Sequence, residues 1–181
     1  MTLRRVGFVL CSSSEQPIPS TRISVLNMLP FLRAAGLETF ILFAPVRPSE
    51  TPDLSGVVAR AREVDCEVVV LQKVRGPGAV VLVKQLAAAG VRTVFAVCDV
   101  VDPPMAEATD ATVVVTAYLR SLYPLALQAR IYVVHDGIER PLIGKSDWGS
   151  ERGRANVPLK AVLVTSASIE RLPSFCYPPH G

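Results

Sequence analysis

The sequence predicts an α/β fold in which helices cover a doubly wound, mostly parallel sheet. Half of the 181 residues are apolar and the formal net charge is only +3, so the chain can bury a substantial core. Short runs rich in β-branched residues alternate with longer segments of helical periodicity, as in strands joined by crossover helices. These runs are apolar at nearly every position, which is typical of parallel strands covered on both faces.

Six of these runs are predicted to be strands. Right-handed crossovers between them bring the carboxyl ends of the strands to one edge of the sheet, where a ligand crevice is expected. The predicted strands are Arg5–Cys11, Glu38–Ala44, Glu67–Gln72, Thr93–Val97, Ala111–Val115 and Ile131–Val134.

The longest predicted helix follows the first strand and runs to about Ala35. Ser20 or Thr21 is expected to cap its N-terminus, and Gly36 to end it. Pro30 removes one backbone donor, so the helix should bend or unwind locally at that point. The residues predicted to form its buried stripe are Val25, Met28, Leu29 and Leu32.

Further helices are predicted between the later strands. Gly90 should end one of them, and Thr116 should cap the last. The helix after the fourth strand is expected to be short. The predicted segments are Leu54–Glu63, Ala79–Ala89, Met105–Ala108 and Ala117–Leu127.

The composition changes after Gly137. Residues 139–158 are rich in Gly, Ser, Pro and charge without periodicity, which predicts a linker. Residues 160–165 then have the pattern of another apolar strand, and a lone strand cannot form a domain. Either this strand joins the first sheet or it begins something larger. We expect a domain over residues 1–138, the linker, and the beginning of a truncated second domain over residues 159–181.

Composition also argues against several protein classes. The chain has 19 Lys and Arg against 16 Asp and Glu, and the basic residues do not cluster with aromatics, so nucleic acid is not expected as a partner. The longest apolar stretches are too short or too charged to span a bilayer, and the apolar run after Arg5 is shorter than the core of a signal peptide. We expect a cytoplasmic protein. The small positive charge neither requires nor excludes contact with the inner face of a membrane, and no feature indicates an oligomeric state.

The four cysteines are Cys11, Cys66, Cys98 and Cys176, and no two of them form a C-x-x-C pair. Free reduced thiols are therefore predicted rather than disulfides or a zinc site. Cys11 and Cys98 are expected to end neighbouring strands. A close pair of thiols is one alternative at these positions, but separately packed free cysteines are favoured.

Functional residues in this architecture are expected in the loops that follow the strands. The first such loop contains no glycine, which argues against the glycine-rich fingerprint of a dinucleotide site. It is rich in hydroxyls instead, and Ser20 and Arg22 lie where a helix begins. This arrangement suits a polyol or an anion, and an ordinary capped loop is an equal alternative.

Three other strand ends carry candidate residues. Lys73 follows the third strand and would direct a cation toward the crevice. Asp99 follows the fourth strand, where its carboxylate would orient sugar hydroxyls or act as an acid or base. A metal site is disfavoured there because no third ligand lies nearby in sequence. His135 follows the sixth strand and would act as a base or a hydrogen-bond donor. Asp102, in contrast, is expected to form a turn, and ordinary surface or turn roles are the alternative at the other positions.

Several segments, taken in order, resemble one known family. The segments are Ser20–Ile23, Asn27–Pro30, Leu32–Gly36, Val68–Lys73, Thr93–Asp99, Ala108–Thr116 and Val133–Glu139. Together they look like the N-terminal half of GT-B glycosyltransferases of the family-4 type. In such enzymes the last segment stands where a strand ends in a turn, before the linker to the donor domain.

The resemblance implies a Rossmann-like acceptor domain facing a second domain that holds a nucleoside diphosphate sugar. It implies metal-independent transfer of the sugar to an acceptor hydroxyl, with no cofactor besides the donor substrate. In the family, the basic residues and the E-x7-E motif that hold the donor belong to the second domain. Because this sequence ends before them, we expect the 181 residues alone to be inactive and to bind nucleotide-sugars weakly.

The implied partners are a nucleotide-sugar and a sugar or polysaccharide acceptor. A non-catalytic sugar-binding or partner-binding module, and half of a sugar-nucleotide epimerase, are the alternatives, because likeness of fold does not separate them. The candidate residues are Asp99 and His135 for catalysis, and Ser20, Arg22, Lys73, Asp136 and Gly137 for substrate binding.

Overall fold

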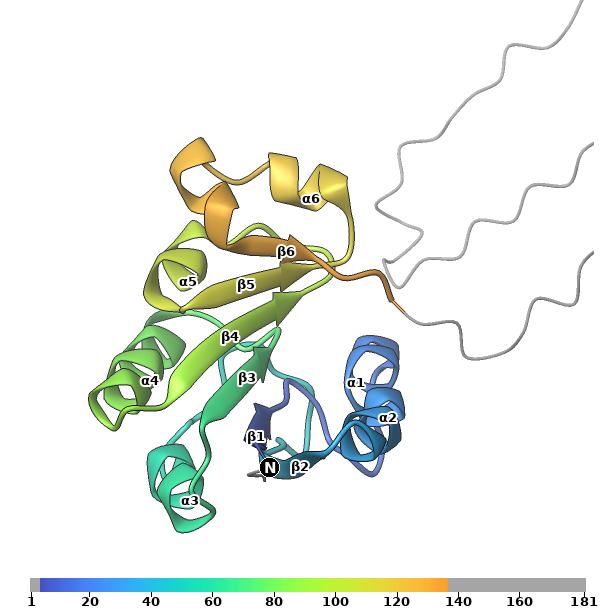
Figure 1. The fold of residues 1–181 in the computed structure, drawn as a ribbon, viewed down its shortest axis with the longest axis vertical. Coiled ribbons are helices and arrows are strands. Elements are labelled where there is room, and N and C mark those ends of the chain that lie inside the picture. The colour runs from blue at the N-terminus through green and yellow to red at the C-terminus, as the bar shows by residue number, and fades with distance from the viewer. Residues whose placement is uncertain (1–3, 137–181) are drawn as a thin grey trace, which may run out of the picture. The chain divides into compact units, whose positions relative to one another are not determined.

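The computed structural model describes residues 4–136, and these form one six-stranded sheet (Figure 1). The strand order is β2-β1-β3-β4-β5-β6, and every neighbouring pair is parallel. The predicted α/β class and its Rossmann-like arrangement are confirmed. The predicted linker, the second domain, Gly137 and Cys176 lie outside the described residues. The strands are β1 (Arg4–Val9), β2 (Leu37–Phe43), β3 (Val68–Gln72), β4 (Arg92–Val97), β5 (Ala111–Val114) and β6 (Ile131–Val133).

The direction of the connections explains how the helices are layered. The step from β1 to β2 crosses the sheet one way, and every later step crosses it the other way. Right-handed crossovers therefore place the first helices on one face and the later ones on the opposite face, as Figure 1 shows. The first face carries α1 (Pro19–Ser24), the 3₁₀ turn η1 (Leu26–Met28) and α2 (Leu29–Ala34). The later helices are α3 (Val57–Glu63), α4 (Pro77–Ala88), α5 (Pro103–Ala108), α6 (Ala117–Ser121) and the 3₁₀ segment η2 (Leu125–Arg130).

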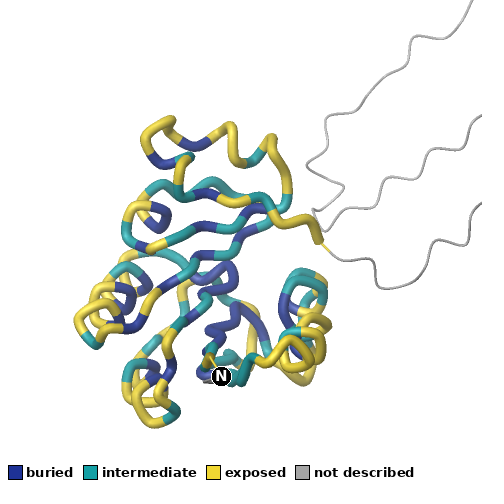
Figure 2. Tube along the Cα trace, viewed as in Figure 1, coloured by how far each residue is buried: buried dark blue, intermediate teal, exposed yellow. Residues whose placement is uncertain are grey.

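Two apolar cores follow from these layers. Buried positions run along the strands and the inner faces of the helices (Figure 2). The smaller core lies between β1 and the first helices and contains Phe8, Leu10, Val25 and Leu29. The larger core lies on the opposite face, where Phe95 of β4 is among the largest fully buried side chains. The sheet is thus fixed from both sides around β1 and β3.

The first helix differs from its prediction because it is broken into three pieces. It begins at Pro19, and neither Ser20 nor Thr21 caps it, since Ile18 occupies the capping position without a side-chain bond. The chain leaves helical geometry at Val25, which has φ −126°, and continues as η1. Pro30 then lies in the first turn of α2, where the missing N–H has no helical partner to lose.

The break also changes which side chains are buried. Val25 and Leu29 are buried as predicted, but Met28 is 37% exposed. The 3₁₀ turn alters the spacing of side chains around the axis, so Met28 no longer lies in the stripe. The predicted helix over 117–127 likewise ends early, at Ser121, and η2 follows Pro124. The predicted cap is confirmed, because Thr116 Oγ1 accepts a hydrogen bond from the Leu119 N–H at 3.1 Å.

Gly7 marks the closest packing of β1 against its neighbours. A Cβ at this position would meet Leu42 Cδ1 and would lie 2.9 Å from Cys66 Sγ, and both of these side chains are buried. We expect Gly7→Ala to lower the free energy of unfolding by about 1–3 kcal/mol through overpacking. Gly78→Ala is the matched control, because nothing lies within 4 Å of its Cβ position at the start of α4. That variant should gain about 0.5–1 kcal/mol in urea unfolding, and equal losses in both variants would contradict the explanation.

Candidate functional site

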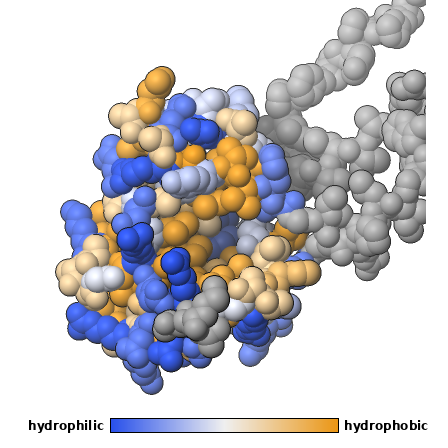
Figure 3. Space-filling view, in the orientation of Figure 1, coloured by the Kyte–Doolittle hydropathy of each residue, from blue (hydrophilic) through white to orange (hydrophobic). Residues whose placement is uncertain are grey.

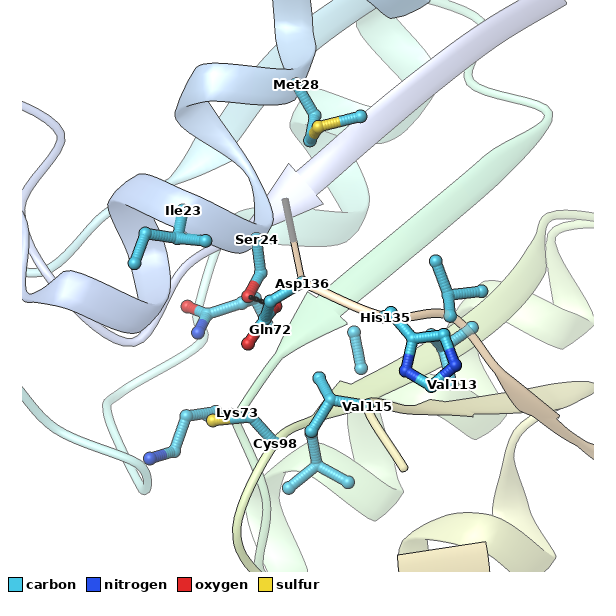
Figure 4. A pocket seen from close by; sticks show the side chains of 13 residues that line it. Ile23, Ser24, Met28, Gln72, Lys73, Cys98, Val113, Val115, His135 and Asp136 are labelled. Atoms are coloured by element: carbon cyan, nitrogen blue, oxygen red, sulfur yellow. Dashed lines mark hydrogen bonds between the residues drawn. The ribbon is translucent and has the colours of Figure 1, made fainter. Parts of the chain in front are cut away.

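A pocket of about 110 Å³ opens at the carboxyl ends of β3, β4, β5 and β6, beside α1 (Figure 4). Drug-sized ligands occupy pockets of roughly 300–1,000 Å³, so this one suits a single ring or a short chain. Its position is the edge at which open α/β sheets bind ligands. The pocket is lined by Ile23, Ser24, Met28, Gln72, Lys73, Ala96, Val97, Cys98, Val113, Val115, Val134, His135 and Asp136.

A buried polar network fixes α1 against the end of β3. The side chain of Gln72 is only 2% exposed, and its Oε1 accepts hydrogen bonds from Thr21 Oγ1 at 2.9 Å and Cys11 Sγ at 3.3 Å. Thr21 Oγ1 in turn accepts from the hydroxyl of Ser12 at 2.8 Å. Buried polar groups need such partners, so these residues hold α1 in one position. The next turn of α1 supplies Ser24 to the pocket.

Lys73 follows β3 with φ +57°, a left-handed conformation that non-glycine residues seldom adopt. Its side chain is 11% exposed, and its Nζ lies 2.6 Å from Asp99 Oδ2 and 3.4 Å from Glu50 Oε1. Figure 4 shows the ammonium pointing away from His135. Contrary to the sequence prediction, Lys73 lines the pocket with its stem while two carboxylates hold its cation.

Glu50 is the residue of this cluster that the sequence prediction missed. It lies in the loop between β2 and α3, and its Oε2 accepts from Arg75 Nε at 2.7 Å. Its carbonyl oxygen accepts from the Arg75 N–H, also at 2.7 Å. No local pattern marks this residue, because the loop reaches β3 only in the folded chain. Asp102 was predicted to form a turn, but it caps α5 instead, because its Oδ1 accepts a hydrogen bond from the Met105 N–H at 3.0 Å.

Two of the predicted site residues follow β6 and line the pocket with their polar side chains. His135 and Asp136 are both exposed and both line it. Asp136 Oδ1 accepts a hydrogen bond from Ser24 Oγ at 2.9 Å, which joins α1 to the segment after β6. Asp99 does not line the pocket. Its side chain is 52% exposed and it contacts Lys73 instead.

Ser20 and Arg22, two other predicted site residues, lie on α1 outside the pocket lining. Ser20 is on α1, where its hydroxyl accepts from Gln72 Nε2 at 3.5 Å, and Arg22 is exposed on the same helix. Neither of them lines the pocket. The prediction that Cys11 and Cys98 end neighbouring strands is wrong, because β3 lies between β1 and β4. Cys11, Cys66 and Cys98 are free, as predicted.

The surroundings of Lys73 and Cys98 set their protonation at neutral pH. Desolvation is the largest effect on the pKa of Lys73 and lowers it, but the hydrogen bond to Asp99 and attraction from nearby acidic groups outweigh it, so the net pKa is raised. Desolvation, followed by repulsion from Asp99, raises the pKa of Cys98 to about 11. Lys73 is therefore charged near pH 7, and Cys98 is a thiol with little nucleophilic character.

These shifts predict a loss of stability at alkaline pH. The Cys98 thiol loses its proton near 9.0 when unfolded and near 11 when folded, so between these values the unfolded chain binds fewer protons and is favoured. Lys73 acts in the same direction, because the stability it contributes is lost as the pH rises above 10.5 through its raised pKa. Urea unfolding at about pH 8 and pH 10.5 should show the loss, and Cys98→Ala should reduce it. An unchanged pH dependence in that variant would contradict the role of Cys98.

Residues 4–136 contain neither a candidate metal site nor a helix that could span a membrane. No group of three or more His, Cys, Asp and Glu side chains is arranged to hold a metal ion in this part of the chain. No helix among the same residues is long and apolar enough to cross a membrane.

The pocket collects Ser24, His135 and Asp136 from connections far apart in sequence, which is the arrangement of a ligand site on an α/β scaffold. Comparison with known proteins adds no assignment to this picture. No protein-family model matches the sequence, and no curated protein matches it significantly.

Proposed function

We propose that this chain forms the acceptor-binding half of a glycosyltransferase that uses a nucleoside diphosphate sugar. The pocket at the carboxyl ends of the strands carries the proposal, because it gathers Ser24, His135 and Asp136 around one opening. An acceptor hydroxyl in this opening meets a hydroxyl, an imidazole and a carboxylate, each of which can accept its proton or a hydrogen bond. The ordered sequence resemblance to glycosyltransferases agrees with this chemistry.

In the proposed reaction, the acceptor oxygen forms a bond to the anomeric carbon of the donor sugar. The bond from that carbon to the diphosphate breaks, and the diphosphate leaves with the electron pair. The acceptor proton goes to the imidazole of His135 or the carboxylate of Asp136 as general base. Ser24 orients Asp136 through their 2.9 Å hydrogen bond. Asp99 is a positioning residue in this scheme, since it acts on Lys73 and not on the pocket.

The size of the pocket supports binding of the acceptor in this domain and of the donor sugar nucleotide in a second one. About 110 Å³ is too little for a nucleoside diphosphate sugar but sufficient for part of an acceptor. Lys73 is already paired with Asp99 and Glu50, so its charge is compensated without a diphosphate. Both observations agree with a donor that is held mainly by a second domain.

Ligand titration followed by nuclear magnetic resonance tests the proposal. Methyl glycosides of glucose, mannose and galactose are expected to shift the signals of His135 and the Val113 methyl groups, both of which face the pocket. UDP-glucose and GDP-mannose should leave these signals unchanged. Asp136→Asn should weaken the best glycoside by about tenfold, because a hydrogen bond to a charged acceptor becomes one to a neutral acceptor.

The matched control is Asp53→Asn, an exposed carboxylate in the loop before α3 that lies outside the pocket lining. This variant should bind glycosides as the original chain does. The proposal fails if no glycoside moves the pocket signals. It also fails if a nucleotide-sugar binds tightly in this pocket, because the donor would then occupy the place assigned to the acceptor.

A further inference from the structure

One face of the sheet is left uncovered over β4, β5 and β6 by the described helices. The helices α1 and α2 pack on β1 and on parts of β2 and β3, where they bury Phe8 and Leu10. The helices α3, α4 and α5 lie on the opposite face (Figure 1). Parallel sheets are ordinarily covered on both faces, so an open half-face made of strands is unusual. It begins at the pocket and extends along the three strands.

Apart from Arg92 at the start of β4, the side chains on this half-face are apolar or aromatic. Successive residues of a strand point to opposite faces, so Ala96 and Val113 of the pocket identify the open face of β4 and β5. Tyr132 and Val134 are 57% and 56% exposed, whereas Ile131 on the other face is buried. Figure 3 shows apolar side chains at the surface in the region of β6. The apolar part of this face is formed by Val94, Ala96, Ala111 and Val113, which are half-buried, and by Tyr132 and Val134, which are exposed.

The pocket continues this apolar surface and adds polar groups on one side. Val134 lines the pocket together with Val113 and Val115. Figure 4 shows Val113 and Val115 on one side, and the hydrogen-bonded pair of Ser24, which ends α1, and Asp136 on the other. A ligand that fits both regions has an apolar body and a hydroxyl. Sugar hydroxyls laid against the valines would lose hydrogen bonds to water without replacement, whereas an alkyl chain would be stabilised by leaving water.

We infer that the acceptor is an uncharged, hydroxyl-bearing molecule with an aliphatic chain, and not a free sugar or polysaccharide. The inference rests on the proposed function and narrows its substrate class. The hydroxyl end lies at Ser24, His135 and Asp136, and the chain lies along the open face of β5 and β6. A negatively charged acceptor is disfavoured by Asp136, because the ammonium of Lys73 points away from the pocket and is paired with carboxylates.

Three probes separate the apolar and sugar contributions to binding: methyl β-D-glucoside, hexyl β-D-glucoside and 1-hexanol. Calorimetric titration of the whole chain should show that the hexyl glucoside binds at least tenfold more tightly than the methyl glucoside, since each buried methylene adds to the affinity. 1-Hexanol should also bind and should compete with the hexyl glucoside. Nuclear magnetic resonance should place the hexyl chain at the methyl groups of Val113 and Val134.

Replacing valine by threonine keeps the shape of the side chain and adds a hydroxyl. Val113→Thr and Val134→Thr should each weaken hexyl glucoside binding by about fivefold, and the methyl glucoside, which has no alkyl chain beyond its methyl group, by much less. Val134 is half exposed at the end of β6, so this variant should fold even if the other does not. Val46→Thr is the control, because Val46 is 92% exposed and lies outside the pocket.

The outcomes distinguish the inference from the proposed function. Equal affinities for the methyl and hexyl glucosides would overturn the aliphatic acceptor and leave the sugar-binding proposal standing. Binding of 1-hexanol and the hexyl glucoside, with none of the methyl glucoside at any concentration, would support the apolar site and go against the role of a sugar. Absence of binding by all three probes would overturn both. An equal loss in Val46→Thr and Val113→Thr would also overturn the inference.

Discussion

Phe95→Ala should lower the free energy of unfolding by about 3–5 kcal/mol, the largest effect that we expect from a single substitution. Phe95 is fully buried in β4, between Leu71 of β3 and Thr112 of β5. The lost ring would leave a cavity at the centre of the larger core, and close-packed neighbours fill such a cavity only in part. Urea unfolding monitored by circular dichroism measures the change.

The control for Phe95 is Leu125→Ala. Leu125 is also a large apolar residue, but it is exposed at the start of η2. Its replacement should change the stability by no more than about 0.5 kcal/mol. A loss of less than about 1 kcal/mol in Phe95→Ala would mean that the core is not packed around this ring as the structure shows.

Gln72→Leu should lower the free energy of unfolding by about 2–4 kcal/mol, although leucine is close to glutamine in size. The substitution removes the oxygen that accepts from Thr21 Oγ1 and from the N–H and thiol of Cys11. Buried donors without a partner cost more than an ordinary hydrogen bond gains. Because the network holds α1, we also expect glycoside binding at Ser24 and Asp136 to weaken in this variant.

A double variant separates this explanation from a simple loss of packing. Gln72→Leu combined with Thr21→Val removes donor and acceptor together, so its stability loss should be smaller than the sum of the two single losses. Gln85→Leu on the exposed side of α4 is the control and should stay within about 0.5 kcal/mol of the original chain. Strictly additive losses at Gln72 and Thr21 would show that the two side chains are not coupled.

The strands could be predicted closely because they are continuous apolar runs. The run predicted over 67–72 is β3 at Val68–Gln72, and the run over 93–97 is β4 at Arg92–Val97. The first helix was harder to predict. The sequence signals the break through Pro30, but the chain unwinds before the proline, at Val25, so that the proline can start a new helix.

The site could be predicted only in part, since strand ends can be read from sequence but contacts between distant loops cannot. His135 and Asp136 follow a clear apolar run, which placed them correctly at the carboxyl edge. Asp136 is bonded to Ser24, and Lys73 is paired with Glu50. In each pair the two residues belong to segments far apart in the sequence, and no periodic pattern indicates that these segments meet. The strand order caused the error over Cys11 and Cys98, because the insertion of β3 between their strands follows from the topology alone.

The contact between Ser24 and Asp136 has a consequence for how the protein is made. The two residues are 112 positions apart, so the ribosome has to add all of the intervening chain before they can meet. At typical rates of synthesis this takes on the order of ten seconds, and α1 and the early strands leave the ribosome during that time. The binding pocket can therefore be completed only after all six strands, β1 to β6, have been synthesised.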